Sequence, residues 1–271
     1  MKHKSQHGGR QKQTASRADR WRDEKKKPNG REAFISGING VKESLASPHV
    51  HVKKLWVDAK KLTPFGYEVV KPFQKIICDT KVEPCPYGDV QQGMAALVDL
   101  PTWPSLEEFA ESHNQSAPLW VVLDQIEDPM NLGQILRTCE GAGVTAVILP
   151  ERRSVQMTQT VAQVSQGAFA WMPVLPITNL RWALEILKEQ GAWIIGCEFS
   201  PEARLWDELS WTGPTALVMG AEGSGLRDLT RRTCDHLAYL PMLGKIDSLN
   251  VGAALSAFLY EACRQRLKSK Y

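Results

Sequence analysis

Short apolar runs alternate with amphipathic stretches throughout the second half of the chain. The apolar runs predict strands at 119–123, 144–149, 193–197, 215–219 and 237–240. The intervening stretches, with apolar residues three or four positions apart, predict helices at 131–141, 158–166, 179–189, 225–233 and 249–267. Strands that are apolar along their whole length and separated by helices are typical of a parallel sheet covered on both faces. The pattern therefore predicts an α/β domain over residues 118–271.

A smaller α/β unit is predicted ahead of it, over residues 32–100. Its pattern indicates a helix at 38–46, a strand at 52–57, a segment broken by proline near 69–77 and a strand at 94–98. Prolines and a polar run then predict a linker over 101–117, with a short helix capped by Ser105. Two domains are thus expected, and 271 residues with 43% hydrophobic content can build both cores.

The first 31 residues differ in composition from the rest of the chain. They carry eleven Lys or Arg and three Asp or Glu, a net charge of +8, while residues 32–271 carry −5. With almost no aliphatic side chains, residues 1–31 cannot bury enough apolar surface to offset the entropy of ordering, so we expect a disordered basic tail. Such a tail is either a solubilising extension or an electrostatic arm for a phosphate-bearing partner, and we favour the arm.

Several classes of protein are excluded by composition. The apolar runs are far shorter than the roughly 20 residues that a membrane-spanning helix needs, and the N-terminus lacks the apolar stretch of a secretory signal. We therefore expect a cytoplasmic protein without a membrane span. The six cysteines include no Cys-x-x-Cys pair and the six histidines are dispersed, so we expect neither disulfides nor a metal site.

A first candidate for chemistry is the segment 123–143, which runs from a strand end into a helix. Pro129 and Asn131 suit the start of a helix, and Gly133 and Arg137 lie four residues apart on one helical face. A glycine there lets a ligand backbone approach the guanidinium, which fits a phosphate. The alternative is that Arg137 is an ordinary solvated surface residue.

A second candidate is the segment 217–227, a buried strand that ends in a glycine-rich loop. Its glycine spacing matches neither the dinucleotide fingerprint nor the P-loop. Glu222 lies inside the loop, where a carboxylate would repel a pyrophosphate and would suit hydroxyls, amides or a cationic group. This argues against a nicotinamide or nucleoside triphosphate site.

A third candidate is the segment 240–256, in which a strand end meets a turn and a long helix. Ser248 or Asn250 can cap this helix, and the small residues 252–254 in its first turn permit close backbone approach. An ordinary contact between helix and sheet is the alternative explanation of these small residues.

In order and spacing, the three segments resemble the three motifs of the SpoU/TrmH branch of the SPOUT superfamily. These motifs are D-P-x-N-x-G-x-x-x-R, G-x-E-G-x-G and P-M-x-G-x-x-x-S-L-N-V, and the chain carries every fixed position of each. The resemblance covers residues 119–267. It extends to residues 36–41 and 90–98, which resemble the two ends of the ribosomal-protein-like substrate-binding domain of the family.

This resemblance implies a fold and an activity. The expected fold is an α/β domain with a parallel sheet and a deep trefoil knot, and the expected reaction is transfer of a methyl group from S-adenosylmethionine to a ribose 2′-hydroxyl in RNA. Matched position by position, the residues implied for cofactor binding are Gly220, Leu240, Met242, Gly244 and Leu249. Those implied around the reacting ribose are Asn131, Arg137, Glu222, Ser248 and Asn250.

The role expected of Arg137 is electrostatic. A guanidinium stays protonated at neutral pH and rarely accepts a proton, so we assign Arg137 to stabilising the developing alkoxide and gripping the adjacent phosphate. The resemblance also implies a homodimer through the knotted domain. For its interface we consider one stripe of the 249–267 helix, formed by Leu255, Phe258, Leu259 and Ala262, with core packing as the alternative.

The RNA substrate is narrowed by the separate N-terminal domain. A separate domain ahead of the methyltransferase domain resembles the organisation of the bacterial enzymes that modify guanosine in 23S rRNA. We therefore favour 23S rRNA as the substrate and keep tRNA as the runner-up. A catalytically inactive RNA-binding relative is a further alternative. A nucleotide-dependent oxidoreductase ranks lower, because the glycine fingerprint is missing after the first strand.

Overall fold

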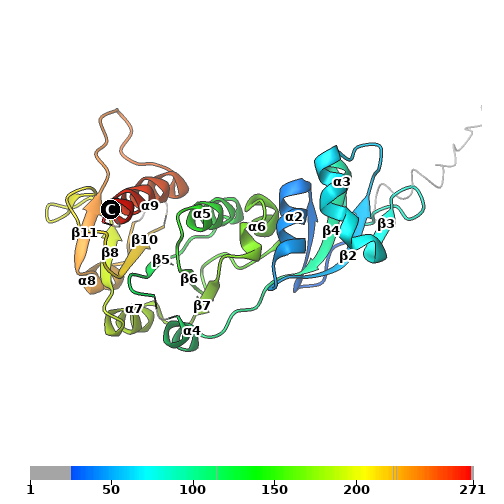
Figure 1. Cartoon of the computed structure of the whole chain (residues 1–271). Coiled ribbons are helices and arrows are strands. Elements are labelled where there is room, and N and C mark those ends of the chain that lie inside the picture. Colours follow the sequence, from blue (N-terminus) through cyan, green and yellow to red (C-terminus); the bar gives the residue numbers. More distant parts are fainter. Residues whose placement is uncertain (1–25, 114, 222, 224, 270–271) are drawn as a thin grey trace, which may run out of the picture.

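The computed structural model describes residues 26–113, 115–221, 223 and 225–269 and contains two α/β units (Figure 1). The predicted basic tail therefore lies almost wholly outside the described residues. The N-terminal unit has a four-stranded sheet in the order β1-β4-β2-β3, in which only β2 and β3 pair in parallel. Its strands are β1 (Glu32–Ser36), β2 (His51–Val57), β3 (Ile77–Asp79) and β4 (Met94–Asp99). Its helices are α2 (Ile38–Ala46), α3 (Pro64–Val70), η1 (Lys71–Ile76) and η2 (Gln91–Gly93).

The C-terminal unit has a seven-stranded sheet in the order β7-β6-β5-β10-β8-β11-β9, and all its strand pairs are parallel. The strands are β5 (Leu119–Leu123), β6 (Ala146–Pro150), β7 (Val174–Ile177), β8 (Trp193–Cys197), β9 (Arg204–Leu205), β10 (Thr215–Met219) and β11 (His236–Tyr239). The predicted α/β class and parallel sheet are thus confirmed. The trefoil knot stays a prediction.

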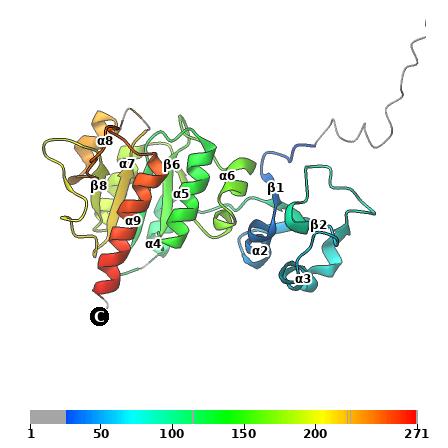
Figure 2. The same ribbon diagram turned by 90° about the horizontal axis from the view of Figure 1, so that it is seen from above.

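Helices cover both faces of this sheet, as the apolar strands require. Along β5, Leu119, Val121 and Leu123 belong to one core, while Trp120 and Val122 belong to the core on the opposite face. The first face carries α5 (Pro129–Gly141) and α9 (Val251–Lys268), which lie side by side (Figure 2). The remaining helices are α4 (Leu106–Ser112), α6 (Gln159–Val164), η3 (Ala168–Ala170), α7 (Leu180–Glu189) and α8 (Asp228–Thr233).

The helix expected in the linker is present as α4. Ser105 caps it in a capping box with Glu108, whose side chain accepts from the Ser105 N–H. Leu106 and Phe109 of this helix are buried in the core that also contains α7. The linker segment therefore contributes to the packing of the C-terminal unit.

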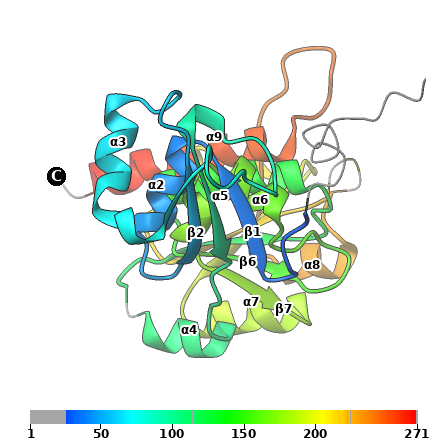
Figure 3. The ribbon, with the colours of Figure 1, turned by 90° about the vertical axis from the view of Figure 1, so that its right-hand side faces the viewer.

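A shared core and a pair of reciprocal hydrogen bonds hold the N-terminal unit against the α6–η3 segment (Figures 1 and 3). The Ser36 N–H donates to Oε1 of Gln163 (2.8 Å), and Nε2 of Gln163 donates to the Ser36 carbonyl oxygen (2.7 Å). Nε1 of Trp171 donates to a carboxylate oxygen of Glu43 (2.9 Å). Phe169 and Ala170 belong to the same apolar core as Ala33 and Ile35 of β1, and η3 contacts α2. These contacts give the N-terminal unit a defined position beside the β6–β7 side of the large sheet.

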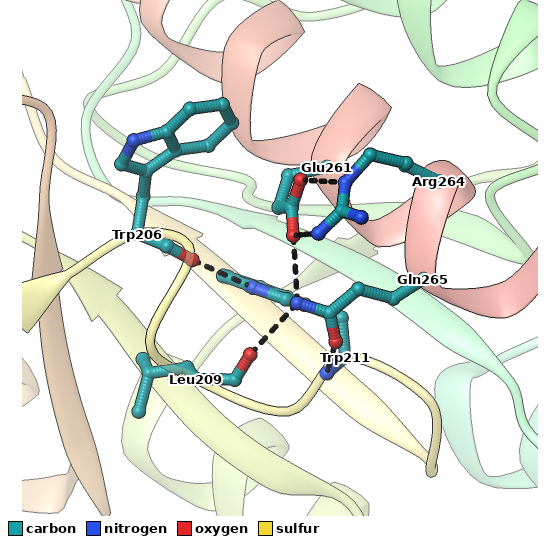
Figure 4. Close-up of polar contacts among 6 residues, drawn as sticks. All are labelled: Trp206, Leu209, Trp211, Glu261, Arg264 and Gln265. Carbon is teal, nitrogen blue, oxygen red and sulfur yellow. Dashed lines mark hydrogen bonds and ion pairs between the residues drawn. The ribbon is translucent and has the colours of Figure 1, made fainter. Parts of the chain in front are cut away.

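Glu261 anchors the second half of α9 to the loop before β10 (Figure 4). Its carboxylate is 4% exposed and accepts two hydrogen bonds from Arg264, at 2.7 and 2.6 Å. It also accepts from Nε2 of Gln265 (2.7 Å), which in turn donates to the Leu209 carbonyl oxygen (3.0 Å). Oε1 of Gln265 accepts from the Trp211 N–H (3.0 Å). The Arg264 guanidinium lowers the pKa of Glu261 below its ordinary value.

We predict that Glu261→Gln lowers the free energy of unfolding by about 1–2 kcal/mol at pH 7. Because the folded-state pKa is depressed, this contribution is complete above the pKa of the unfolded carboxyl and disappears as the pH falls through the folded-state pKa. Urea unfolding of both proteins at pH 7 and below pH 4 should therefore give a difference that shrinks in acid.

A suitable control is Glu185→Gln, since Glu185 forms only a 3.9 Å exposed pair with Arg181. Its effect should stay below about 0.5 kcal/mol at either pH. A Glu261→Gln difference that did not change with pH would contradict the prediction.

Candidate active site

The carboxyl ends of four strands form a continuous edge of the large sheet. Leu123 of β5 pairs with Met219 of β10, Met219 pairs with Cys197 of β8, and Cys197 pairs with Ala238 of β11. In the sheet, β5 has β6 and then β7 on one side and β10 on the other, so the strand order reverses at β5. Ligands of open α/β sheets bind outside the carboxyl ends of the strands where the strand order reverses. The loops after these strands are therefore the place to look for a site.

These loops enclose a cavity of about 540 Å³. Four of the five residues predicted for cofactor binding line it together: Gly220, Leu240, Met242 and Leu249. Ser248, predicted beside the ribose, lines it as well. The fifth cofactor residue, Gly244, lies outside this lining, and a Cβ added there would meet no atom within 4 Å.

The glycine-rich loop after β10 is tight, which explains the need for glycine at position 220. The Ala221 N–H donates to the Gly225 carbonyl oxygen (3.1 Å) and the Gly225 N–H donates back to Ala221 (3.0 Å). Gly225 has φ +67°, in the left-handed region. A Cβ on Gly220 would lie 2.3 Å from the carbonyl carbon and oxygen of Gly225. Only a residue without a side chain fits at the start of this loop.

The described lining of the cavity suits S-adenosylmethionine. Leu240, Met242 and Phe258 offer an apolar surface of the kind that takes an adenine, within the roughly 300–1,000 Å³ typical of small-molecule sites. Glu198 and Asp247 are carboxylates, which favour a cationic sulfonium or ammonium group. The described lining contains no Lys or Arg, so it offers no partner for a phosphate-bearing cofactor.

A second hollow of about 380 Å³ adjoins this cavity and shares Ala221 and Val251 with it. Asn131, 7% exposed at the start of α5, lines the hollow. Nδ2 of Asn250 donates to Oδ1 of Asn131 (2.9 Å), and Oδ1 of Asn250 accepts from the Gly252 N–H (2.9 Å) to cap α9. The structure thus brings together two amides that lie 119 positions apart in the chain.

Arg137, also predicted around the ribose, lies away from both cavities. Arg137 lies on the exposed face of α5, about 9 Å farther along the helix axis than Asn131, and lines neither cavity. Its guanidinium has no hydrogen bond or ion pair with the part of the chain that the structure describes. Glu222 lies outside the described residues.

A buried ion pair at the base of the glycine-rich loop lies partly outside the three motifs. Asp124, 1% exposed, directly follows β5. Its Oδ2 accepts from Oγ1 of Thr230 (2.8 Å) and Nε of Arg227 (3.1 Å), and its Oδ1 lies 2.8 Å from Nη2 of Arg227. Glu198, directly after β8, similarly accepts from the Leu226 N–H (3.0 Å). An acidic residue placed immediately after an apolar strand was the available signal for both.

Cys197 lines the cavity. Burial raises its pKa well above the ordinary value, which disfavours the reactive thiolate. No group of three or more His, Cys, Asp or Glu that could hold a metal ion occurs among the described residues. Within the same residues, no helix combines the length and apolarity needed to span a bilayer.

Solved structures share this fold. The SpoU methyltransferase AviRb from Streptomyces viridochromogenes, crystallised with AdoMet, matches with a TM-score of 0.72 and 21% identity over 92% of this chain and 97% of that one. An AdoMet-bound rRNA methyltransferase from Sinorhizobium meliloti matches with a TM-score of 0.69 and 22% identity, over 86% of this chain and 87% of that one.

Sequence relatives are closer. A putative TrmH family tRNA/rRNA methyltransferase of Staphylococcus haemolyticus is 36% identical over 86% of this chain and 95% of the relative. The 23S rRNA (guanosine-2′-O-)-methyltransferase RlmB of Pseudomonas putida is 36% identical over 86% of this chain and 96% of the relative. The model of the SpoU rRNA Methylase family matches residues 118–260, more than half of the chain. The protein therefore belongs to the SpoU rRNA methylase family of S-adenosylmethionine-dependent RNA 2′-O-ribose methyltransferases.

Proposed function

We propose that this protein methylates the ribose 2′-hydroxyl of a guanosine in 23S rRNA. The observation that carries the proposal is the junction of the two cavities, where the Asn131–Asn250 pair lies beside a space suited to S-adenosylmethionine. The name of the Pseudomonas putida relative, which is similar along nearly its whole length, supports guanosine in 23S rRNA. A tRNA target is the second candidate, because the name of the Staphylococcus relative includes both RNA classes.

Positioning is the main task of the site. When bound, the cofactor supplies an electrophilic methyl group on a sulfonium. Gly220, Leu240 and Leu249 hold the cofactor, and the Asn131–Asn250 pair holds the ribose in the adjoining hollow. Aligning the 2′-oxygen with the methyl carbon supplies roughly 7–11 kcal/mol of the barrier. Arg137 is exposed and lies outside both cavities, so we assign its guanidinium to a phosphate of the bound RNA and not to the reacting oxygen.

We further propose that the protein is a homodimer, with an interface different from the stripe suggested by the sequence. Leu255, Phe258, Leu259 and Ala262 are all buried in the core of their own subunit, so that stripe cannot form an interface. The exposed large apolar side chains of α5 and α9 are Met130, Tyr260 and Leu267, which are 47%, 58% and 59% exposed, and we place the interface at Met130 and Tyr260. Light scattering of Tyr260→Glu should show dissociation to monomers if this face holds the dimer.

Asn131→Ala should lower kcat about 10²-fold, because the ribose loses its alignment with the methyl group. S-adenosylmethionine affinity, measured by calorimetry, should change less than twofold, since Asn131 lies outside the cofactor cavity. Gln134→Ala, an exposed change on the same helix, is the matched control and should keep full activity. Loss of cofactor binding in Asn131→Ala, or unchanged kcat, would contradict this assignment.

The substrate is tested by mapping 2′-O-methyl groups in cells that lack the protein and by methylating unmodified transcripts in vitro. We expect one lost mark, at a guanosine of 23S rRNA, and methylation of that transcript by the purified protein. A lost mark in tRNA would replace the proposed substrate with the runner-up. Cofactor binding without methylation of either RNA would instead indicate an inactive RNA-binding relative.

A further inference from the structure

The loop between β6 and α6 lies next to the ribose hollow. It follows the carboxyl end of β6, the strand beside β5. The Val155 N–H donates to the carbonyl oxygen of Ile126 (2.8 Å), and Ile126 lines the hollow. The loop is therefore joined by a main-chain hydrogen bond to the wall of the site.

One side chain of this loop binds its backbone at three places. Nε2 of Gln156 donates to the carbonyl oxygens of Pro150 (2.9 Å), Glu151 (3.3 Å) and Ser154 (3.3 Å). Arg153 has φ +57°, a left-handed conformation that costs a non-glycine residue of order 1–3 kcal/mol unless the surroundings impose it. The loop is a defined structure that presents its side chains in set directions.

Arg152 and Arg153 are both exposed at the tip of this loop. Neither guanidinium has a hydrogen bond or ion pair with any residue that the structure describes. By contrast, Arg227 and Arg264 of the same unit are paired with the carboxylates of Asp124 and Glu261. Two adjacent guanidinium groups left in solvent provide charge and planar donors for phosphate oxygens.

The acidic groups nearby restrict where a phosphate can lie. Glu127 and Asp128 line the ribose hollow, and Glu151 is exposed before the two arginines. Carboxylates in the hollow repel phosphate and tolerate a ribose hydroxyl. An RNA strand with its ribose in the hollow therefore has its backbone drawn toward Arg152 and Arg153.

The loop also lies on the route from the ribose hollow to the N-terminal unit. It leads directly into α6, where Gln163 makes the paired hydrogen bonds with Ser36. In Figure 1 the N-terminal unit lies beyond α6, on the side of the sheet away from the cofactor cavity. A strand that reaches both the hollow and the N-terminal unit passes this loop.

We infer that Arg152 and Arg153 bind phosphates of the RNA strand next to the methylated nucleotide and guide it toward the N-terminal unit. The inference rests on the proposed function, since it assumes that the ribose occupies the hollow beside Asn131. It adds a phosphate-binding loop to the site, formed by residues outside all three motifs.

The test compares the double variant R152A/R153A with the wild-type protein, using an unmodified 23S rRNA transcript as the probe. Loss of two phosphate contacts should raise the KM for RNA about tenfold and reduce the slope of log affinity against log salt concentration by about 1.4. We expect kcat and S-adenosylmethionine affinity to stay within twofold. R152K/R153K should recover most of the RNA affinity, because lysine also binds phosphate.

The matched control is R204A/R232A, which removes two exposed positive charges at the β9 edge of the large sheet, opposite the β6–β7 edge that carries the loop. An unchanged salt slope in R152A/R153A, or an equal change in the control, would overturn the inference. A lowered unfolding midpoint with an unchanged salt slope would also overturn it and would give the loop a structural role. Failure of the wild-type protein to methylate the transcript would contradict the proposed function instead, and the salt slope of binding would still test the loop.

Discussion

Gly220→Ala is expected to weaken S-adenosylmethionine binding between tenfold and about 10²-fold while the protein stays folded. The added Cβ would lie 2.3 Å from the backbone of Gly225 and 2.6 Å from the nitrogen of Leu226. These are backbone atoms, so no side-chain rotation relieves the overlap, and the loop must open by moving a cavity wall. Overpacking of this kind costs typically 1–3 kcal/mol, which gives the expected range of affinity.

Calorimetric titration with the cofactor measures this effect, and thermal unfolding shows whether the fold survives. Gly213→Ala is the control, since a Cβ there meets no atom within 4 Å and Gly213 lies outside the cavity lining. It should bind the cofactor like the wild-type protein. Unchanged affinity in Gly220→Ala would mean that the loop is not part of the cofactor site.

Arg227→Ala is expected to lower the free energy of unfolding by about 3 kcal/mol, because the Asp124 carboxylate is left buried without its charged partner. This value is at the lower end of the range for breaking a buried ion pair, since Arg227 is 45% exposed and water can reach the carboxylate once the arginine is removed. The unfolding midpoint should fall by roughly 6–12 °C. Cofactor affinity should fall too, because Arg227 holds the end of the glycine-rich loop.

Two further variants separate this cause from a general loss of charge. Arg231→Ala removes a neighbouring arginine whose carboxylate contacts are 3.7 and 3.9 Å, and it should cost less than about 1 kcal/mol. Adding Asp124→Asn to Arg227→Ala should restore part of the lost stability, since no charge then remains buried. If Arg227→Ala lowered the free energy of unfolding no more than Arg231→Ala does, the stabilising role assigned to the Arg227–Asp124 pair would be contradicted.

Strands buried on both faces were predicted well. The runs at 119–123, 193–197 and 215–219 match β5, β8 and β10 at both ends, because these strands are apolar and, apart from the exposed Trp193 and the partly buried Cys197 at the ends of β8, buried throughout. The strands that went unpredicted depend on distant partners or carry weak signals. β1 depends on its pairing with β4, in which Glu32 lies opposite Asp99. β7 contains Pro176, which weakens the strand signal, and β9 is only two residues long.

The candidate site was predicted in part. The three motifs led to Gly220, Leu240, Met242 and Leu249, which line one cavity, and to the Asn131–Asn250 pair beside it. Motif spacing did not indicate that Arg137 lies away from both cavities or that Gly244 lies outside the lining. The assignment of these residues to catalysis and cofactor binding stays a proposal.

By itself, the sequence determined the α/β class, the central strands and the three segments to which we assign the chemistry, because these depend on local periodicity and on residue types a few positions apart. Only the tertiary structure decided that Asp124 holds Arg227, that Gln163 joins the two units and that the apolar stripe of α9 is buried in its own subunit. The first two contacts join segments far apart in the chain, and the third depends on which face of the helix the core covers. The pattern of residues along the chain specifies neither which distant segments meet nor which helical face is buried.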